Sequence, residues 1–366
     1  MKWPRRHELG QLLLCHPDGI AASTGGKNGS TPFIIPSGSG SGDNTTSLVD
    51  LRVRVEDGDY ENWSTLVPRT DIDPRNVTSS DQVVSTMDTL RHEEVIRACL
   101  SAHRPLILCG PPGSGKTMTL TATLNALHEL VLLPLNFSST TTPELILKTL
   151  QQHCELVQTS KRGTVLRPSP TFGPNRWLVI FCDEINLPAE DKYGTVRVIS
   201  FLRQLVEQGG FHRGLRGVLG QQSRPSAASK APSASARSWA SSSSSSSSSS
   251  WVSLERIQFV AACNPPTDSG RIPLSLRFLR HASLIFVDYP TTESLKLIYG
   301  ALNRALLRVP SLNRGSGGNE LLSYADPMTD AMVDFWWRNQ ARFKVDDAPQ
   351  YIFSPRELSR WVSNLI

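Results

Sequence analysis

Long apolar runs are missing from this sequence. No stretch approaches the roughly 18 apolar residues that a membrane-spanning helix needs, so we expect no membrane span. The cysteines form no C-x-x-C pair, and most lie in apolar segments, which favours buried, reduced thiols over metal ligands or disulfides. Blocks of like charge are also missing, although the formal net charge is +5. Scattered basic residues are typical of a solvated surface, so we expect no nucleic-acid partner.

Three polar, low-complexity stretches divide the chain. They cover residues 18–46, 214–250 and 313–319, and the second ends in an unbroken serine run. Such tracts bury too little apolar surface to offset the entropy of the chain. We predict an unassigned N-terminal segment over 1–47, a large α/β subdomain over 48–290 with a surface insertion at 214–250, and a small helical subdomain over 291–366.

Strand and helix patterns alternate between these stretches and then give way to helices alone. We expect strands at 105–109, 131–137, 177–182, 257–263 and 284–287, and helices at 116–130, 143–156 and 191–208. Thr142 is the expected N-cap of the second helix. Helices only are expected at 292–307, 329–342 and 355–365. This order predicts a parallel sheet flanked by helices, followed by a small helical domain.

A complete phosphate-binding pattern, G-x-x-x-x-G-K-[ST], follows the first strand and opens the first helix. Its glycines let successive backbone N–H groups point at phosphate oxygens, and the helix adds its positive N-terminus. We expect the lysine to reach the β- and γ-phosphates and the threonine hydroxyl to ligate Mg²⁺. The pattern consists of Gly110, Pro111, Pro112, Gly113, Ser114, Gly115, Lys116 and Thr117.

Polar residues end two later strands. Asp183 and Glu184 follow the apolar strand that starts at Trp177, and such a strand carries its last side chains to the carboxyl edge of the sheet, where ligands bind. We expect Asp183 to hold Mg²⁺ and Glu184 to polarise the attacking water. Asn264 ends another strand, where it orients that water or contacts the γ-phosphate; the alternative is that it only starts a turn before Pro265.

With these motifs in this order, the sequence resembles the AAA+ P-loop NTPases. More narrowly, it resembles the third AAA+ module of cytoplasmic dynein heavy chains. The strings that carry the closer resemblance are residues 51–69, 85–92, 107–120, 135–149, 181–211, 254–281 and 351–361. They include NFSS from Asn136, DKYGT from Asp191 and SPREL from Ser354.

The resemblance implies an ATP·Mg²⁺-dependent module whose nucleotide state regulates the main ATPase site of a motor that moves toward microtubule minus ends. Arg356 matches the sensor 2 arginine of the lid. Arg277 matches the arginine finger, which serves a neighbouring module, with Arg280 as a rival. A surface ion pair is the alternative for Arg356 and Arg277. Val84 matches an adenine contact.

Partners and location are also implied by the resemblance. The partners are neighbouring AAA+ modules of the same chain and, through parts absent from this sequence, microtubules and the dynein intermediate and light chains. The location is cytoplasmic, on the cytoskeleton. Two other readings stay open: a remodelling ATPase of another multi-module AAA+ ring, and a nucleotide-binding scaffold with little hydrolysis.

The sequence departs from the dynein pattern in three ways. It is far shorter than a heavy chain, so we expect a fragment or a partial gene model. Residues 214–250 replace a short turn in a hairpin before Trp251, and we expect their serine tract to be either a mispredicted intron or a tolerated exposed loop. The lid stops soon after Trp361, so we expect its last helices to be missing.

Overall fold

The computed structural model describes residues 50–54, 57–68, 70–77, 83–160, 163–212, 251–309, 321–343, 347–348 and 351–365. The predictions for 1–47, 214–250 and 313–319 lie outside these residues. The chain divides into two compact units, one formed by residues 96–288 and the other by residues 1–95 with 289–366. Within the described residues, no helix is both long and apolar enough to cross a bilayer.

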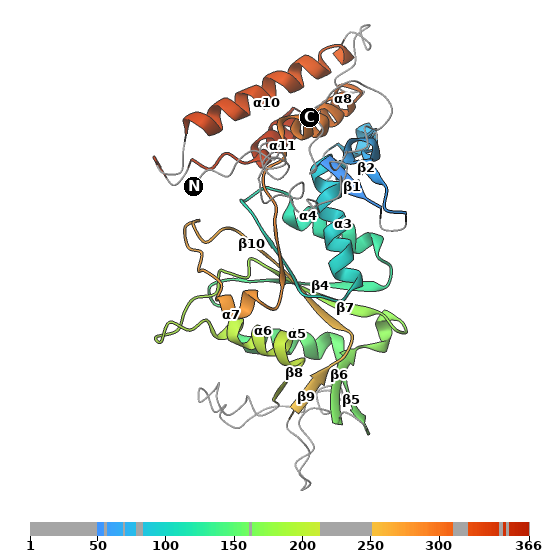
Figure 1. Ribbon diagram of the computed structural model, residues 1–366. Coiled ribbons are helices and arrows are strands. Elements are labelled where there is room, and N and C mark those ends of the chain that lie inside the picture. The colour runs from blue at the N-terminus through green and yellow to red at the C-terminus, as the bar shows by residue number, and fades with distance from the viewer. Residues whose placement is uncertain are drawn as a thin grey trace, which may run out of the picture. The chain divides into compact units, whose positions relative to one another are not determined.

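A five-stranded parallel sheet is the centre of the 96–288 unit. Its strands are β3 (Leu106–Cys109), β4 (Leu130–Asn136), β7 (Trp177–Asp183), β10 (Ile257–Cys263) and β11 (Ser283–Phe286). Their order across the sheet is β11-β3-β10-β7-β4, and every neighbouring pair is parallel. Figure 1 labels β10, β7 and β4 among the strands of this unit. The expected strands and the parallel sheet are therefore confirmed, and each strand bound lies within one residue of its prediction.

Helices cover both faces of this sheet because the buried strand residues alternate between the faces. Leu106, Leu108 and Val179 pack on one side against the C-terminal half of α3 (Met87–Ser101) and against α4 (Lys116–Ala126). Ile107 and Ile180 pack on the other side against α5 (Pro143–His153), α6 (Arg197–Gln208) and the short α7 (Leu276–Leu279). Two apolar layers thus hold the sheet and leave its carboxyl edge to carry polar residues.

Only one part of the second sheet, the hairpin before Trp251, was expected from the sequence. It contains β5 (Cys154–Thr159), β6 (Gly163–Pro168), β8 (Gly210–His212) and β9 (Trp251–Leu254), in the order β5-β6-β9-β8. The helix predicted for 143–156 ends at His153 instead, because residues 154–159 pair antiparallel with β6. Thr142 is the N-cap as predicted, although its side chain makes no capping hydrogen bond.

Two other predicted helices have different bounds. The helix expected from Asp191 begins at Arg197, because the Asp191 carboxylate accepts the N–H groups of Tyr193 and Thr195, each at 2.9 Å, and so forms a local turn. The helix expected over 116–130 ends at Ala126. The end of α6 is as predicted, since Gly209 takes a left-handed conformation with φ of 63°.

The other unit combines N-terminal segments with the C-terminal helices. Its N-terminal part contains β1 (Leu51–Val53), β2 (Tyr60–Asn62), α2 (Trp63–Leu66), the 3-10 turn η2 (Pro74–Asn76) and the start of α3. Its C-terminal part contains α8 (Thr292–Leu307), α10 (Ala325–Arg342) and α11 (Pro355–Asn364). Ile72 and Val84 share one buried cluster with Leu295, Tyr299 and Trp336. The prediction of helices alone after residue 291 is confirmed for the described residues.

Candidate functional site

The loop from residue 110 to 117 joins β3 to α4, as the phosphate-binding pattern requires. Gly113 and Gly115 have φ of 81° and 90°, a backbone conformation that is unfavourable for residues with a Cβ atom. Gly110 lies so close to the sheet that an added Cβ would be 1.9 Å from the Val287 carbonyl oxygen. The glycines are therefore required by the backbone path, which turns the loop over the end of β3.

Lys116 is buried at the first position of α4. Its ammonium donates hydrogen bonds to the carbonyl oxygens of Gly110 and Pro111, both at 2.8 Å, and to Oδ1 of Asn264 at 3.1 Å. Burial lowers the pKa of Lys116, and the negative charge of Glu184 opposes this shift. Burial disfavours the charged form of a lysine, and a nearby anion stabilises that form, so Lys116 is suited to bind a phosphate.

Asp183 and Glu184 lie at the same edge of the sheet, at the end of β7, which β10 separates from β3. Thr117 donates its hydroxyl proton to Oδ2 of Asp183 at 3.3 Å. The other carboxylate oxygen of Asp183 accepts the backbone N–H of Glu184 at 3.0 Å. The sheet order explains the arrangement, because β10 lies between β3 and β7 and delivers Asn264 between the lysine and the acids. The structure thus brings Lys116, Thr117, Asp183 and Asn264 together.

Two polar residues at this edge were not found from the sequence. Asn186 donates from Nδ2 to the carbonyl oxygen of Asn264 at 2.9 Å, and its own carbonyl oxygen accepts the N–H of Ile272 at 3.0 Å. Arg271 forms an ion pair with Glu184 through Nη1 and Oε2. Both lie within strings named above, 181–211 and 254–281, but neither was given a role there. Asn186 follows β7 directly, whereas Arg271 reaches the acidic strand because β10 lies beside β7.

The residues of the loop suit a nucleoside triphosphate with Mg²⁺. The hydroxyl of Ser114 is buried and has no hydrogen-bond partner within the described residues, so it is available to a phosphate oxygen. Mg²⁺ prefers hard oxygen ligands and shares them with phosphates, and the Thr117 hydroxyl and Asp183 carboxylate are of that kind. No group of three or more His, Cys, Asp or Glu side chains that could hold a metal occurs in the described part of the chain.

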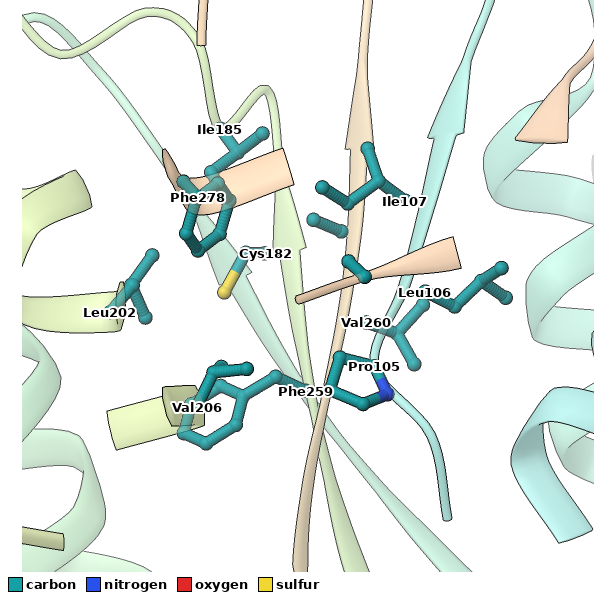
Figure 2. Close-up of a pocket in the computed structure, with 12 residues that line it drawn as sticks. Pro105, Leu106, Ile107, Cys182, Ile185, Leu202, Val206, Phe259, Val260 and Phe278 are labelled. Atoms are coloured by element: carbon teal, nitrogen blue, oxygen red, sulfur yellow. The ribbon is translucent and has the colours of Figure 1, made fainter. Parts of the chain in front are cut away.

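An apolar cavity within the 96–288 unit is a different feature. Figure 2 shows it between the sheet and the helices α6 and α7, with Ile107, Cys182 and Phe259 from the strands and Leu202 and Phe278 from the helices. Its volume is about 20 Å³ and all its lining is apolar. A space of that size is close to that of a single water probe, so it is a packing defect of the core and not a nucleotide site.

The arginines and Val84 lie elsewhere. Arg277 is exposed on α7 and has no ion pair within the described residues, whereas Arg280 donates to Glu207 at 2.7 Å. Arg356 is exposed in the first turn of α11, and Val84 is buried in the cluster around Leu295. The last two residues belong to the unit that contains 289–366, so their roles at the loop stay predictions.

Comparisons with known proteins agree with this geometry. A family model described as the P-loop containing dynein motor region matches residues 72–216, and one described as the dynein heavy chain ATPase lid domain matches residues 302–366. The chain is 49% identical over 319 residues to a cytoplasmic dynein heavy chain of Dictyostelium discoideum. It is 48% identical over 318 residues to that of Caenorhabditis elegans, and 43% identical over 318 residues to dynein heavy chain-like protein 1 of Plasmodium falciparum. Each alignment covers 87% of this chain, which spans about 6% of the length of each relative.

Proposed function

Since the chain belongs to the AAA+ module family of dynein motor heavy chains, we propose that it binds ATP·Mg²⁺ at the loop between Gly110 and Thr117 and hydrolyses it slowly. One observation carries the proposal. The buried ammonium of Lys116 lies 3.1 Å from Asn264, and Thr117 lies 3.3 Å from Asp183. The lysine, hydroxyl, acid and amide therefore converge at the carboxyl ends of three parallel strands, β3, β7 and β10.

Each residue has a proposed task. Backbone N–H groups of residues 110–117 and the α4 N-terminus hold the phosphates. Lys116 neutralises the β- and γ-phosphates, while Thr117 and Asp183 hold Mg²⁺. Glu184 polarises the attacking water, and Asn264 orients it.

We further propose roles for the residues that lie away from this edge. Arg356 is the sensor 2 residue that contacts the γ-phosphate, and Val84 contacts adenine. Arg277 serves as an arginine finger for a neighbouring module, which its exposure and lack of an ion pair in the described residues support. The division into an α/β subdomain over 48–290 and a lid over 291–366 is kept as part of the same proposal.

At the level of the motor, we propose the role of the third AAA+ module. ATP turnover here would regulate the main ATPase site of the heavy chain and thereby minus-end-directed movement along microtubules in the cytoplasm. The partners would be the neighbouring modules of the same chain and, through other parts of it, microtubules and the intermediate and light chains. The identity of 49% with a heavy chain that is itself cytoplasmic supports this assignment.

The site assignment is tested with Lys116→Ala and Glu184→Gln in the 366-residue chain. Binding of a fluorescent ATP analogue gives the dissociation constant, and single-turnover conversion of radiolabelled ATP gives the hydrolysis rate. Lys116→Ala should weaken binding by at least about tenfold, because a charge-assisted hydrogen bond contributes about 1.5–3 kcal/mol. Glu184→Gln should leave binding nearly unchanged and lower hydrolysis by about 100-fold or more.

Lys148→Ala is the matched control, because Lys148 is exposed on α5 and forms no ion pair within the described residues. It should bind and hydrolyse ATP like the unaltered chain. Equal affinity of the Lys116→Ala and Lys148→Ala variants would reject the binding site. ATP binding without any ADP formation in the unaltered chain would instead favour the nucleotide-binding scaffold.

A further inference from the structure

Glu184 needs more than its own strand to hold its side chain in place. Its backbone lies in the left-handed region with φ of 57°, which is uncommon for a residue other than glycine. The N–H of Glu184 donates to Oδ1 of Asp183 at 3.0 Å, the N–H of Ile185 donates to the carbonyl of Ala262 at 3.1 Å, and the N–H of Leu187 donates to the carbonyl of Glu184 at 3.0 Å. None of these hydrogen bonds restrains the carboxylate of Glu184.

Arg271 supplies that restraint. Its Nη1 contacts Oε2 of Glu184, and the arginine side chain is only 15% exposed. The arginine starts from a fixed base: its N–H donates to the carbonyl of Asp268 at 3.2 Å, and the N–H of Ile272 donates to the carbonyl of Asn186. Asn186 in turn donates to the carbonyl of Asn264. Two hydrogen bonds of Asn186, to Asn264 and from Ile272, therefore connect the loop after β7 with the loop after β10.

We propose that Arg271 is a positioning residue for the ATP hydrolysis assigned to this site, and that it acts by holding the carboxylate of Glu184 in the orientation that polarises water. The inference rests on the proposed function. It assigns a cis-acting role to a residue that lies within the 254–281 string but was given no role from the sequence.

The geometry favours positioning over blocking. The arginine contacts a single oxygen, Oε2, and within the described residues Oε1 accepts no hydrogen bond. A carboxylate offers about four lone-pair sites, so one N–H contact leaves Oε1 for a water molecule. A catalytic group must be held within about 0.5 Å of its working position. The guanidinium of Arg271 can hold the Glu184 carboxylate in this way, because hydrogen bonds fix the loop that carries the arginine.

The test compares Arg271→Met and Arg271→Lys with the unaltered 366-residue chain in single-turnover hydrolysis and in ATP binding. Arg271→Met should lower the hydrolysis rate by about 10–100-fold, as loss of a supporting contact does at other sites, while the dissociation constant for ATP stays within about twofold. Arg271→Lys should recover most of the rate, because the contact uses one N–H group and an ammonium can supply it.

A double-variant comparison decides whether Arg271 acts through Glu184. In the Glu184→Gln chain, adding Arg271→Met should change the residual rate by less than about twofold, because the group that the arginine positions has already been lost. Arg167→Met is the matched control, since Arg167 also pairs with a glutamate, Glu155 at 2.7 Å, in the second sheet. That variant should hydrolyse ATP at the unaltered rate.

Four results would overturn the inference. A faster rate in Arg271→Met would show that the arginine blocks Glu184, and an unchanged rate would show that the pair has no part in hydrolysis. Weaker ATP binding with an equal loss in Arg271→Lys would show a purely structural role. If the unaltered chain binds ATP but does not hydrolyse it, both the proposed function and this inference fail. If the unaltered chain hydrolyses ATP and only the Arg271 variants depart from expectation, the inference alone fails.

Discussion

Replacing Gly110 by alanine should both destabilise the α/β unit and weaken ATP binding. The new Cβ would lie 1.9 Å from the Val287 carbonyl oxygen, whereas such contacts stay above 3.0 Å in real proteins. The loop or the end of β11 must therefore move by about 1 Å in a closely packed interior. Val287 cannot move freely, because its N–H donates to the carbonyl of Cys109 at 2.7 Å.

The cost follows from these two effects. Overpacking costs about 1–3 kcal/mol, and a strained backbone hydrogen bond adds up to about 1 kcal/mol. We expect a loss of about 3 kcal/mol in the free energy of unfolding, which lowers the melting temperature by about 6–12 °C for a unit of this size. The displaced loop should also bind ATP at least about tenfold more weakly, since about 1 Å of misplacement is costly at a site that must fit closely.

Thermal unfolding followed by circular dichroism and fluorescent ATP-analogue binding measure the two effects. Gly300→Ala in α8 is the matched control, because its Cβ would meet only the flexible Arg304 guanidinium, at 3.4 Å. Alanine inside a helix is more favourable than glycine by about 1 kcal/mol, so this variant should be slightly stabilised and bind ATP normally. If Gly110→Ala matched the unaltered chain in both measurements, the close approach of the loop to Val287 would be refuted.

Two other predictions concern different parts of the chain. A hydrogen bond from the Cys263 thiol and the charge of Lys116 lower the pKa of Cys109 to about 7 against the opposing effect of burial. The thiolate is the reactive form of cysteine, so the rate of Cys109 alkylation by iodoacetamide should rise with pH to a midpoint near 7. Peptide mass spectrometry measures this rate, and Cys109→Ser is the control. A midpoint near the ordinary pKa of 9.0 would contradict the prediction. Tyr299→Phe removes a buried hydrogen bond from the tyrosine hydroxyl to the carbonyl of Pro355, at 2.5 Å. The free energy of unfolding, measured by urea denaturation, should fall by about 1–2 kcal/mol. An unchanged denaturation midpoint would show that this bond does not hold α11 on α8.

The parts of the site that could be predicted from the sequence are those fixed by local chemistry. Gly113 and Gly115 need left-handed backbone, Lys116 must open a helix, and Asp183 must end an apolar strand, so short patterns were enough to identify them. Such rules act over a few residues along one segment. They predicted the strands of the first sheet for the same reason.

What could not be predicted depends on contacts between distant segments. The second sheet is joined by the parallel pairing of Thr164–Leu166 with Val252–Leu254, far apart in the sequence. Arg271 and Asn186 reach the acidic edge only because β10 lies beside β7, an order that hydrophobic patterns do not encode. The Asp191 turn was missed because its side chain competes with helix formation by accepting two backbone N–H groups, which residue spacing alone does not reveal.

The insertion before Trp251 should be dispensable for ATP binding. It forms most of residues 213–250, which connect β8 to β9 in the sequence. The last antiparallel partners of these strands are His212 and Trp251, so a two-residue Asn-Gly turn can close the hairpin in place of residues 213–250. The site lies at the other end of β10, and seven residues of strand span about 23 Å. We therefore expect the shortened chain to unfold at the same temperature or slightly higher and to bind the ATP analogue within about twofold of the full chain, since closing a shorter loop costs less entropy. Lys116→Ala in the shortened chain is the control for binding at the loop. Weaker binding by a shortened chain that still folds would show that the insertion contributes to the site, and loss of folding would show that the His212–Trp251 pairing is wrong.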